Sequence, residues 1–197
     1  MKIGVLAVQG AVAEHIQMLS RLNTEAIPIR LPSELDGLDA VVIPGGESTT
    51  IGKLLSDYKL MEPIRELADQ GFPIFGTCAG MILLAKRVAD SSLEPLGVMD
   101  IEVKRNAFGR QVDSFETDLA IPVLGDGTFH GIFIRAPMVE KAESGVEILC
   151  QLYNNAVAVK QGKILACAFH PELTDDLRFH RYFLDLVTGD ALAESNC

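Results

Sequence analysis

Short apolar runs alternate with amphipathic segments along the first half of the chain, and this pattern restricts the fold more than any other feature. Four apolar runs have the length and composition of buried strands: 3–8, 25–29, 40–43 and 73–76. Four segments with helical periodicity follow them, at 11–22, 48–55, 61–70 and 79–89. Strands that alternate with helices across short loops predict the α/β class, with a mostly parallel central sheet and helices on both faces.

The second half of the chain has a different pattern. Strand-like segments follow one another at 100–105, 120–123, 128–134, 147–152, 156–160 and 163–169. We interpret them as an antiparallel extension that ends with a return to the main sheet. A last helix is predicted over about 175–187. A chain of 197 residues fits one large α/β domain, which we place at 1–190, with a frayed tail at 191–197.

Charge and composition exclude several classes of function. The formal net charge of −10 is spread along the chain and disfavours nucleic acid or an anionic membrane as a partner. Hydrophobic residues make up 48%, yet no stretch approaches the roughly 20 apolar residues that cross a bilayer. The N-terminus lacks the pattern of a signal peptide, so a cytoplasmic location is expected. The cysteines form no C-x-x-C pair, which argues against a metal site.

The segment Gly76-Thr77-Cys78-Ala79-Gly80 lies where a predicted strand turns into a predicted helix. This is the cysteine version of the nucleophile elbow, in which the glycines allow a strained turn and close backbone packing. The turn exposes the sulfur at a helix N-terminus, where the thiolate is favoured, and aims the N–H of Ala79 at a developing oxyanion. The alternative is an ordinary strand-to-helix turn with a buried thiol.

The remaining cysteines have weaker patterns. Cys150 and Cys167 lie inside apolar strands and are expected to be inert core residues. Cys197 lies in the polar tail and is interpreted as incidental.

His170 is the candidate base for a thiol nucleophile. It follows the apolar run 164–169 and precedes Pro171-Glu172, so it lies at a strand end, where α/β proteins bind ligands. Pro171 favours an extended His170, and residues i and i+2 of an extended segment share a face. Glu172 is therefore expected to hold one imidazole nitrogen and leave the other for Cys78. A turn with a capping acid is the alternative, and the other histidines are assigned surface or packing roles: His15, His130 and His180.

Three further features complete a candidate site. The Pro44-Gly45-Gly46 turn follows a strand, and its backbone N–H groups are candidates for a second oxyanion donor. Arg105 and Arg135 are candidates for binding a substrate carboxylate, because a guanidinium binds carboxylate in a bidentate fashion. Gln9-Gly10 follows the first strand and is expected at the same sheet edge. Each has a plain structural alternative, as a loop, a surface arginine or a strand-to-helix turn.

The motifs together resemble a known family. The order and spacing of Pro44–Thr49, Gly76–Gly80 and 170–172 resemble class I, triad-type glutamine amidotransferases. Other segments narrow the resemblance to the glutaminase-subunit family of pyridoxal 5′-phosphate synthase: Gln9-Gly10-Ala11-Val12, Arg105-Asn106-x-Phe108-Gly109-Arg110-Gln111-x-Asp113-Ser114-Phe115, Phe133-Ile134-Arg135-Ala136-Pro137 and Phe169-His170-Pro171-Glu172-Leu173-Thr174. The resemblance extends to about Val187.

The resemblance implies that Cys78, His170 and Glu172 form a catalytic triad. It implies glutamine contacts at six positions: Gly46, Glu47, Ser48, Arg105, Ile134 and Arg135. It also implies no cofactor in this chain and L-glutamine as substrate. The implied partner, which receives the ammonia, is a separate (β/α)8-barrel synthase subunit. Two rivals stay open: another triad hydrolase or amidotransferase, such as a γ-glutamyl hydrolase, and a non-enzymatic module with a reactive cysteine.

Overall fold

The computed structural model describes residues 1–89, 91–107 and 114–190. Its main sheet is built from these strands: β1 (Lys2–Leu6), β2 (Glu25–Ile29), β3 (Ala40–Ile43), β4 (Ile74–Thr77), β5 (Ala85–Val88), β6 (Met99–Lys104), β9 (Met138–Ala142), β10 (Glu147–Leu152), β11 (Asn155–Gln161) and β12 (Ile164–Cys167). The strand order is β2-β1-β3-β4-β12-β11-β9-β6-β5, with β10 paired to β11. The first five strands in this order are parallel, and the extension is largely antiparallel. The predicted α/β class is confirmed.

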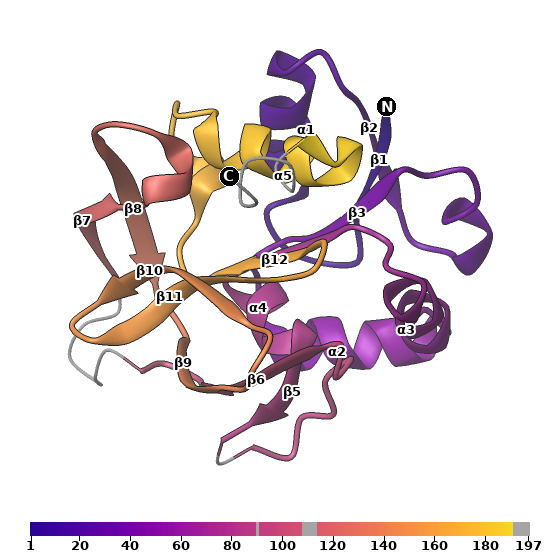
Figure 1. The fold of residues 1–197 in the computed structure, drawn as a ribbon. Helices are drawn as coiled ribbons and strands as arrows, with labels where there is room; N and C mark the ends of the chain where they lie inside the picture. The colour runs from indigo at the N-terminus through magenta and orange to yellow at the C-terminus, as the bar shows by residue number, and fades with distance from the viewer. Residues whose placement is uncertain (90, 108–113, 191–197) are drawn as a thin grey trace.

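Five helices cover the sheet: α1 (Val12–Arg21), α2 (Ser48–Asp57), α3 (Met61–Asp69), α4 (Ala79–Leu84) and α5 (Arg178–Thr188). In Figure 1, α1 and α5 lie on one face of the sheet and α2, α3 and α4 on the other. Short 3-10 turns occur at η1 (Pro32–Glu34), η2 (Pro122–Leu124) and η3 (Pro171–Leu173). Within the described residues, none of the helices combines the length and the apolar character needed to span a bilayer.

A separate antiparallel hairpin, β7 (Ser114–Ala120) and β8 (Thr128–Ile134), lies beside the main sheet. A cluster of fully buried aromatic rings joins it to the rest of the molecule. The cluster contains rings from the hairpin, from β4, from the end of β12 and from α5: Phe75, Phe129, Phe133, Phe169, Phe179 and Phe183. The hairpin is thereby held against the strand end that carries His170.

The structure corrects several sequence-based boundaries. The helix expected over 79–89 ends at Leu84, and β5 follows it because 85–88 pair with β6. The prediction of a strand at 120–123 is wrong. Pro122 has no backbone N–H to donate to a neighbouring strand, and it begins the 3-10 turn η2. The strand in this part of the chain is β7, which ends at Ala120. The sequence pattern did not predict it, because most of its residues are polar. Strand β9 was not expected. The predicted tail at 191–197 lies outside the described residues.

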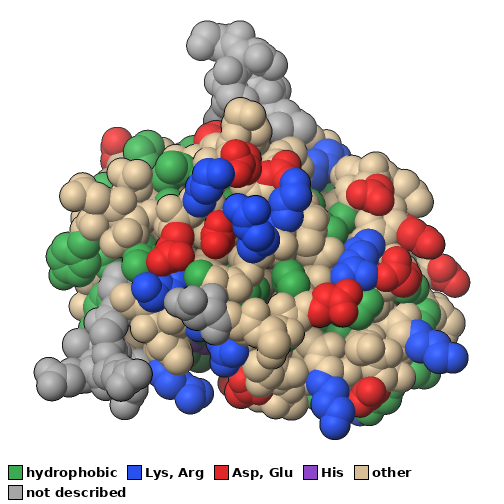
Figure 2. Space-filling model, turned by 90° about the horizontal axis from the view of Figure 1, so that it is seen from below, with side chains coloured by type: hydrophobic (Ala, Val, Ile, Leu, Met, Phe, Trp, Pro, Cys, Tyr) green, Lys and Arg blue, Asp and Glu red, His purple; other side chains and the backbone are tan. Residues whose placement is uncertain are grey.

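The charged surface matches the dispersed acidic composition. Seen from below, acidic and basic side chains intermingle on one face, without a large patch of one sign (Figure 2). Exposed ion pairs link neighbouring strands of the extension, such as Lys86 with Asp100 and Arg87 with Glu102. Exposed pairs of this kind contribute little to stability.

The glycines that flank Cys78 are required by close backbone contacts. A Cβ on Gly80 would overlap the carbonyl oxygen of Ile43, at the end of β3. A Cβ on Gly76 would lie 2.7 Å from the carbonyl carbon of Gly80. Helix α4 therefore lies against β3 and β4 more closely than any side chain permits.

We expect Gly80→Ala to lower the free energy of unfolding by about 3 kcal/mol, because overpacking against backbone leaves nothing flexible to move aside. Gly52→Ala in α2 is the matched control: its Cβ would meet the flexible end of Leu93 at 2.9 Å. Urea unfolding of both variants measures the difference. Equal stabilities of the two variants would contradict the close contact at Ile43.

Helix α2 is capped by Glu47, the residue immediately before its first turn. The Glu47 carboxylate accepts N–H bonds from Thr49 at 3.2 Å and from Thr50 at 2.6 Å. The Thr49 and Thr50 hydroxyls also donate to it. These bonds lower the pKa of Glu47 from 4.5 to about 2. The carboxylate is therefore charged throughout the physiological range.

Replacing Glu47 with Ala is expected to lower the free energy of unfolding by about 1 kcal/mol, the usual effect of losing a helix cap. A carboxyl with a depressed pKa contributes stability above its unfolded pKa and loses it as pH falls towards the folded one. The deficit of the variant is therefore expected to persist down to pH 4.5 and to narrow towards pH 2. Urea unfolding at several pH values measures it, with exposed Glu66→Ala as the control.

Candidate active site

The candidate site lies where four neighbouring parallel strands end. Strands β1, β3, β4 and β12 are consecutive in the sheet, and their carboxyl ends lead to Gln9, Gly45, Cys78 and His170. The carboxyl edge of a parallel sheet is where α/β proteins bind ligands, because the loops there converge. The sheet topology thus brings together motifs that lie up to 161 positions apart, from Gln9 to His170.

Cys78 occupies the turn between β4 and α4 in a strained conformation. Its φ of 48° and ψ of −102° lie in a region that non-glycine residues rarely adopt. The Cys78 N–H donates to the carbonyl of Cys167 at 2.8 Å, which ties the elbow to the neighbouring strand β12. The thiol contacts the carbonyl of Ile134 at 3.7 Å and is 7% exposed. The expected elbow is present, with its sulfur at the edge of a pocket.

His170 and Glu172 make the predicted contact, although Pro171–Leu173 forms the 3-10 turn η3 and not the expected extended segment. His170 Nδ1 lies 2.7 Å from Glu172 Oε1, and both side chains are buried. Burial by itself lowers the pKa of His170, but hydrogen bonds to Cys78 and Glu172 and the charges of both partners raise it to about 10. The imidazole is therefore protonated at neutral pH while it is paired with Cys78 on one side and Glu172 on the other.

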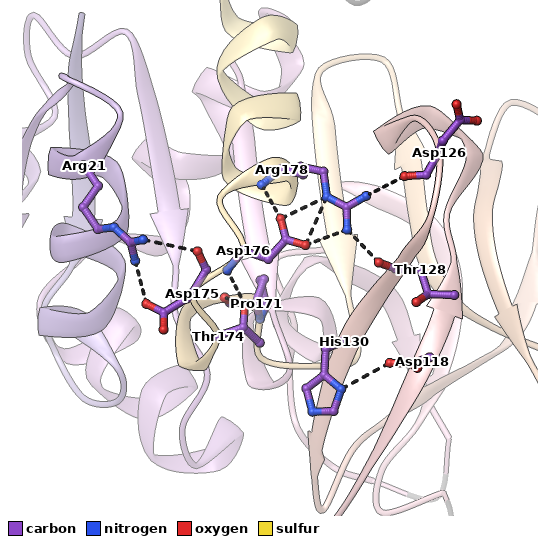
Figure 3. A network of polar contacts seen from close by, with 10 residues as sticks. All are labelled: Arg21, Asp118, Asp126, Thr128, His130, Pro171, Thr174, Asp175, Asp176 and Arg178. Carbon is purple, nitrogen blue, oxygen red and sulfur yellow. Dashed lines mark hydrogen bonds and ion pairs between the residues drawn. The ribbon is translucent and has the colours of Figure 1, made fainter.

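The backbone around His170 is anchored on both sides. The His170 N–H donates to the carbonyl of Ile132 in β8 at 2.8 Å. After η3, Arg21 of α1 binds Asp175 at 3.1 Å (Figure 3). Arg178 binds Asp176 and also donates to the carbonyls of Asp126 and Thr128, at 3.2 and 2.7 Å. The segment that carries His170 is thus fixed to α1 and to the hairpin.

A pocket of about 350 Å³ opens beside Cys78 and His170, near the lower end of the usual range for small-molecule sites. All six predicted glutamine-contact residues line it: Gly46, Glu47, Ser48, Arg105, Ile134 and Arg135. Arg105 forms an ion pair with Glu47 at 3.5 Å across the pocket, and Arg135 is exposed with a φ of 43°. Of the predicted triad and oxyanion residues, Glu172 and Ala79 do not line the pocket. Residues 108–113, which belong to the family segment that begins at Arg105, lie outside the described residues.

Gln9 and Gly10 contact the glycine turn directly. Gln9 Oε1 accepts the N–H of Glu47 at 2.8 Å, and the Ala11 N–H donates to the carbonyl of Gly45 at 3.1 Å. A Cβ on Gly10 would overlap that same carbonyl oxygen, so only glycine fits. The loop after β1 therefore holds the loop after β3 in place.

A cluster of buried polar side chains lies behind the site, and no sequence pattern predicts it. Thr77 Oγ1 accepts the N–H of Gly45 at 3.0 Å and lies 3.1 Å from His15 Nε2. His15 also lies 3.0 Å from His180 and 3.5 Å from Glu172. The expected packing role describes the burial of His15 and His180 but not these contacts. His15 is 157 positions from Glu172, and no local spacing signals their approach.

Other features of the described residues do not form a competing site. Cys150 and Cys167 are buried as expected, and burial raises the pKa of both thiols. A larger cavity of about 760 Å³ between α2 and α3 is open and mixed in charge, and its Arg65 is already paired with Glu62 and Glu94. No group of three or more metal-binding side chains occurs in the described part of the chain.

The chain is similar to known proteins over nearly its whole length. The chain is 56% identical over 187 residues to the pyridoxal 5′-phosphate synthase subunit PdxT of Moorella thermoacetica, covering 95% of this chain and 100% of that one. It is 51% identical over 195 residues to the protein of the same name from Geobacillus kaustophilus, covering 99% of each. A crystal structure of a glutamine amidotransferase superposes with a TM-score of 0.90 at 50% identity, over 94% of this chain and 98% of that one.

More distant structures share the fold alone. The structure of PurLQS from Thermotoga maritima matches with a TM-score of 0.64 at 15% identity, over 99% of this chain and 98% of that one. The family model described as the SNO glutamine amidotransferase family matches residues 5–188, almost the entire described chain. From this match and the identities above 50%, the chain belongs to the SNO glutamine amidotransferase family.

Proposed function

We propose that this chain hydrolyses the side-chain amide of L-glutamine to L-glutamate and ammonia, with Cys78 as nucleophile, His170 as acid and base, and Glu172 as the residue that orients His170. The observation that carries the proposal is the His170–Glu172 hydrogen bond of 2.7 Å beside a strained cysteine at a pocket. This is the geometry of nucleophile, base and orienter that acyl transfer requires.

The mechanism follows from the protonation of His170. Its raised pKa of about 10 keeps the imidazole protonated at neutral pH beside the Cys78 sulfur. The thiolate attacks the side-chain carbonyl carbon of glutamine and forms a tetrahedral oxyanion. As the C–N bond breaks, His170 gives its proton to the leaving nitrogen, and ammonia departs from a thioester. His170 then takes a proton from water, whose oxygen attacks the thioester and releases glutamate.

The pocket supplies groups for both ends of the substrate. Backbone N–H groups of Gly46 and Ala79 are assigned to the oxyanion, since each lies at a turn beside Cys78. Arg105 and Arg135 are assigned to the α-carboxylate, and Glu47, beside Arg105, to the α-ammonium end. Ser48 and Ile134 complete the wall of the pocket.

We further propose that the ammonia passes to a separate (β/α)8-barrel synthase subunit that makes pyridoxal 5′-phosphate. The support is the name shared by relatives 51–57% identical over nearly the whole chain, each a pyridoxal 5′-phosphate synthase subunit. This partner sets the present proposal apart from a γ-glutamyl hydrolase, which would need no second subunit.

Replacing Cys78 with Ala is expected to lower glutamate formation by at least about 10⁴-fold, since the nucleophile is lost. The assay measures glutamate from glutamine with and without the barrel synthase. Cys150→Ala, a buried cysteine outside the pocket, is the control and should keep its activity. Thermal unfolding establishes that both variants are folded. Glutamine hydrolysis retained by Cys78→Ala would refute the assignment of the nucleophile.

Gln9 is proposed to sense the docked synthase, because its side chain holds the N–H of Glu47 beside Gly46. Movement of the Gln9-Gly10 loop would change the glycine turn and complete the oxyanion hole. Gln9→Ala is therefore expected to reduce the activation that the synthase produces by up to about 100-fold, the effect of losing one oxyanion-hole donor. The measurement is the ratio of glutaminase rates with and without the synthase, and exposed Gln17→Ala is the control. If Gln9→Ala is activated by the synthase as strongly as the wild type, Gln9 does not sense the docked synthase.

A further inference from the structure

Three buried polar side chains lie behind the proposed triad and have no part in the mechanism above. They are His15 on α1, Thr77 at the end of β4 and His180 on α5, and each is 0% exposed. None of the three lines the pocket beside Cys78. A buried polar group costs free energy unless it is satisfied, so a connected cluster of this kind calls for a reason.

One member of the cluster, His15, faces the Glu172 oxygen that His170 does not contact. Glu172 Oε1 is bound by His170 at 2.7 Å, whereas Oε2 is fully buried and makes no conventional hydrogen bond among the described residues. The group that faces Oε2 is His15 Nε2, at 3.5 Å. The same nitrogen lies 3.1 Å from Thr77 Oγ1, and His15 Nδ1 lies 3.0 Å from His180 Nε2.

One assignment of ring protons places a donor at Glu172 Oε2, whereas the reverse one lets the Thr77 hydroxyl donate to His15 Nε2. If His180 donates from Nε2 to His15 Nδ1, then His15 carries its proton on Nε2 and directs it at Thr77 and Glu172. The reverse assignment would direct a bare nitrogen at the Glu172 carboxylate. It would also bury the N–H of His180 Nδ1, which has no partner within the described residues. The first assignment avoids both costs, so His180 selects the tautomer of His15.

Burial favours the neutral form of both rings, whereas the charge of Glu172 favours a proton on His15. Burial lowers the pKa of His15, which faces Glu172, His170, His180 and Glu14. Burial also lowers the pKa of His180 well below its usual value. Burial raises the pKa of Glu172, yet His15 and His170 outweigh burial and lower it. Cys167 also faces this carboxylate. His15 is thus the second polar contact that keeps Glu172 ionised.

We propose that His15, held in one tautomer by His180, is a positioning residue that orients the Glu172 carboxylate and keeps it ionised, and that Thr77 links this cluster to the glycine turn at Gly45. This inference rests on the proposed triad and extends it by two histidines. With a donor at each oxygen, the carboxylate stays ionised and aligned with His170. The Gly45 N–H donates to Thr77 Oγ1 at 3.0 Å, so the same cluster also holds the glycine turn that is assigned to the oxyanion.

The test compares His15→Leu with His15→Gln in the complex with the barrel synthase. Leucine fills the site without a donor, whereas the glutamine amide can present an N–H near the position of Nε2. His15→Leu is expected to lower kcat about tenfold or more, the value of a lost bond to a charged group, with KM for glutamine within twofold. His15→Gln is expected to recover most of kcat.

A second readout does not depend on glutamine hydrolysis. Iodoacetamide labelling of Cys78, followed by mass spectrometry across pH, reports formation of the thiolate beside protonated His170. Without a donor from His15, Glu172 holds its proton to higher pH and supports His170 less. The labelling midpoint of His15→Leu is therefore expected at higher pH than that of wild type.

His180→Leu tests the tautomer. It is expected to shift the labelling midpoint in the same direction as His15→Leu, and to add nothing in the double variant, because it acts only through His15. Exposed His130→Leu, which removes an imidazole paired with Glu116 and Asp118, is the control and should leave kcat and the midpoint unchanged.

Two results would overturn the inference. One is a His15→Leu variant with a lower Tm but a wild-type labelling midpoint and kcat, which is the behaviour of a purely structural residue. The other is equal impairment of the Leu and Gln variants. Failure of the proposed function has a separate signature: wild type with synthase forms no glutamate, while the labelling profiles still compare the histidine variants.

Discussion

The close approach of α4 to the ends of β3 and β4 is the constraint on which the rest of the site depends. Gly80 lies so near the carbonyl of Ile43 that no side chain fits between them. This contact turns the chain sharply after β4 and holds Cys78 at a φ of 48°. A strained residue of this kind persists only where its surroundings over-determine it. The sulfur therefore lies at the sheet edge, within reach of His170 on the neighbouring strand.

The buried charge of Glu172 is the second organising element. A carboxylate in the interior must be compensated, and here His170 faces one oxygen and His15 the other. The contacts of His15 with Thr77 and of Thr77 with Gly45 connect this charge to the glycine turn after β3. Cys78, His170 and the glycine turn are thus held by the same elements: α1, α5 and the strands β1, β3, β4 and β12.

Much of the fold was predictable because its pattern is local. The parallel strands and their helices follow from alternation of apolar and amphipathic segments. The elbow and the His170–Glu172 pair follow from glycine placement and an i, i+2 spacing. The errors came where local pattern is weak: 85–88 form a strand only because β6 pairs with them, and β7 alternates residues that are mostly polar and exposed.

The sequence by itself determined the α/β class, the elbow at Cys78 and the candidate triad, because each depends on neighbours along the chain. The tertiary structure alone decided that Gln9 holds the N–H of Glu47 and that Arg105 pairs with Glu47. It alone placed His15 and His180 behind Glu172. Those contacts join segments 38 to 165 positions apart, and only the order of strands in the sheet brings such segments together.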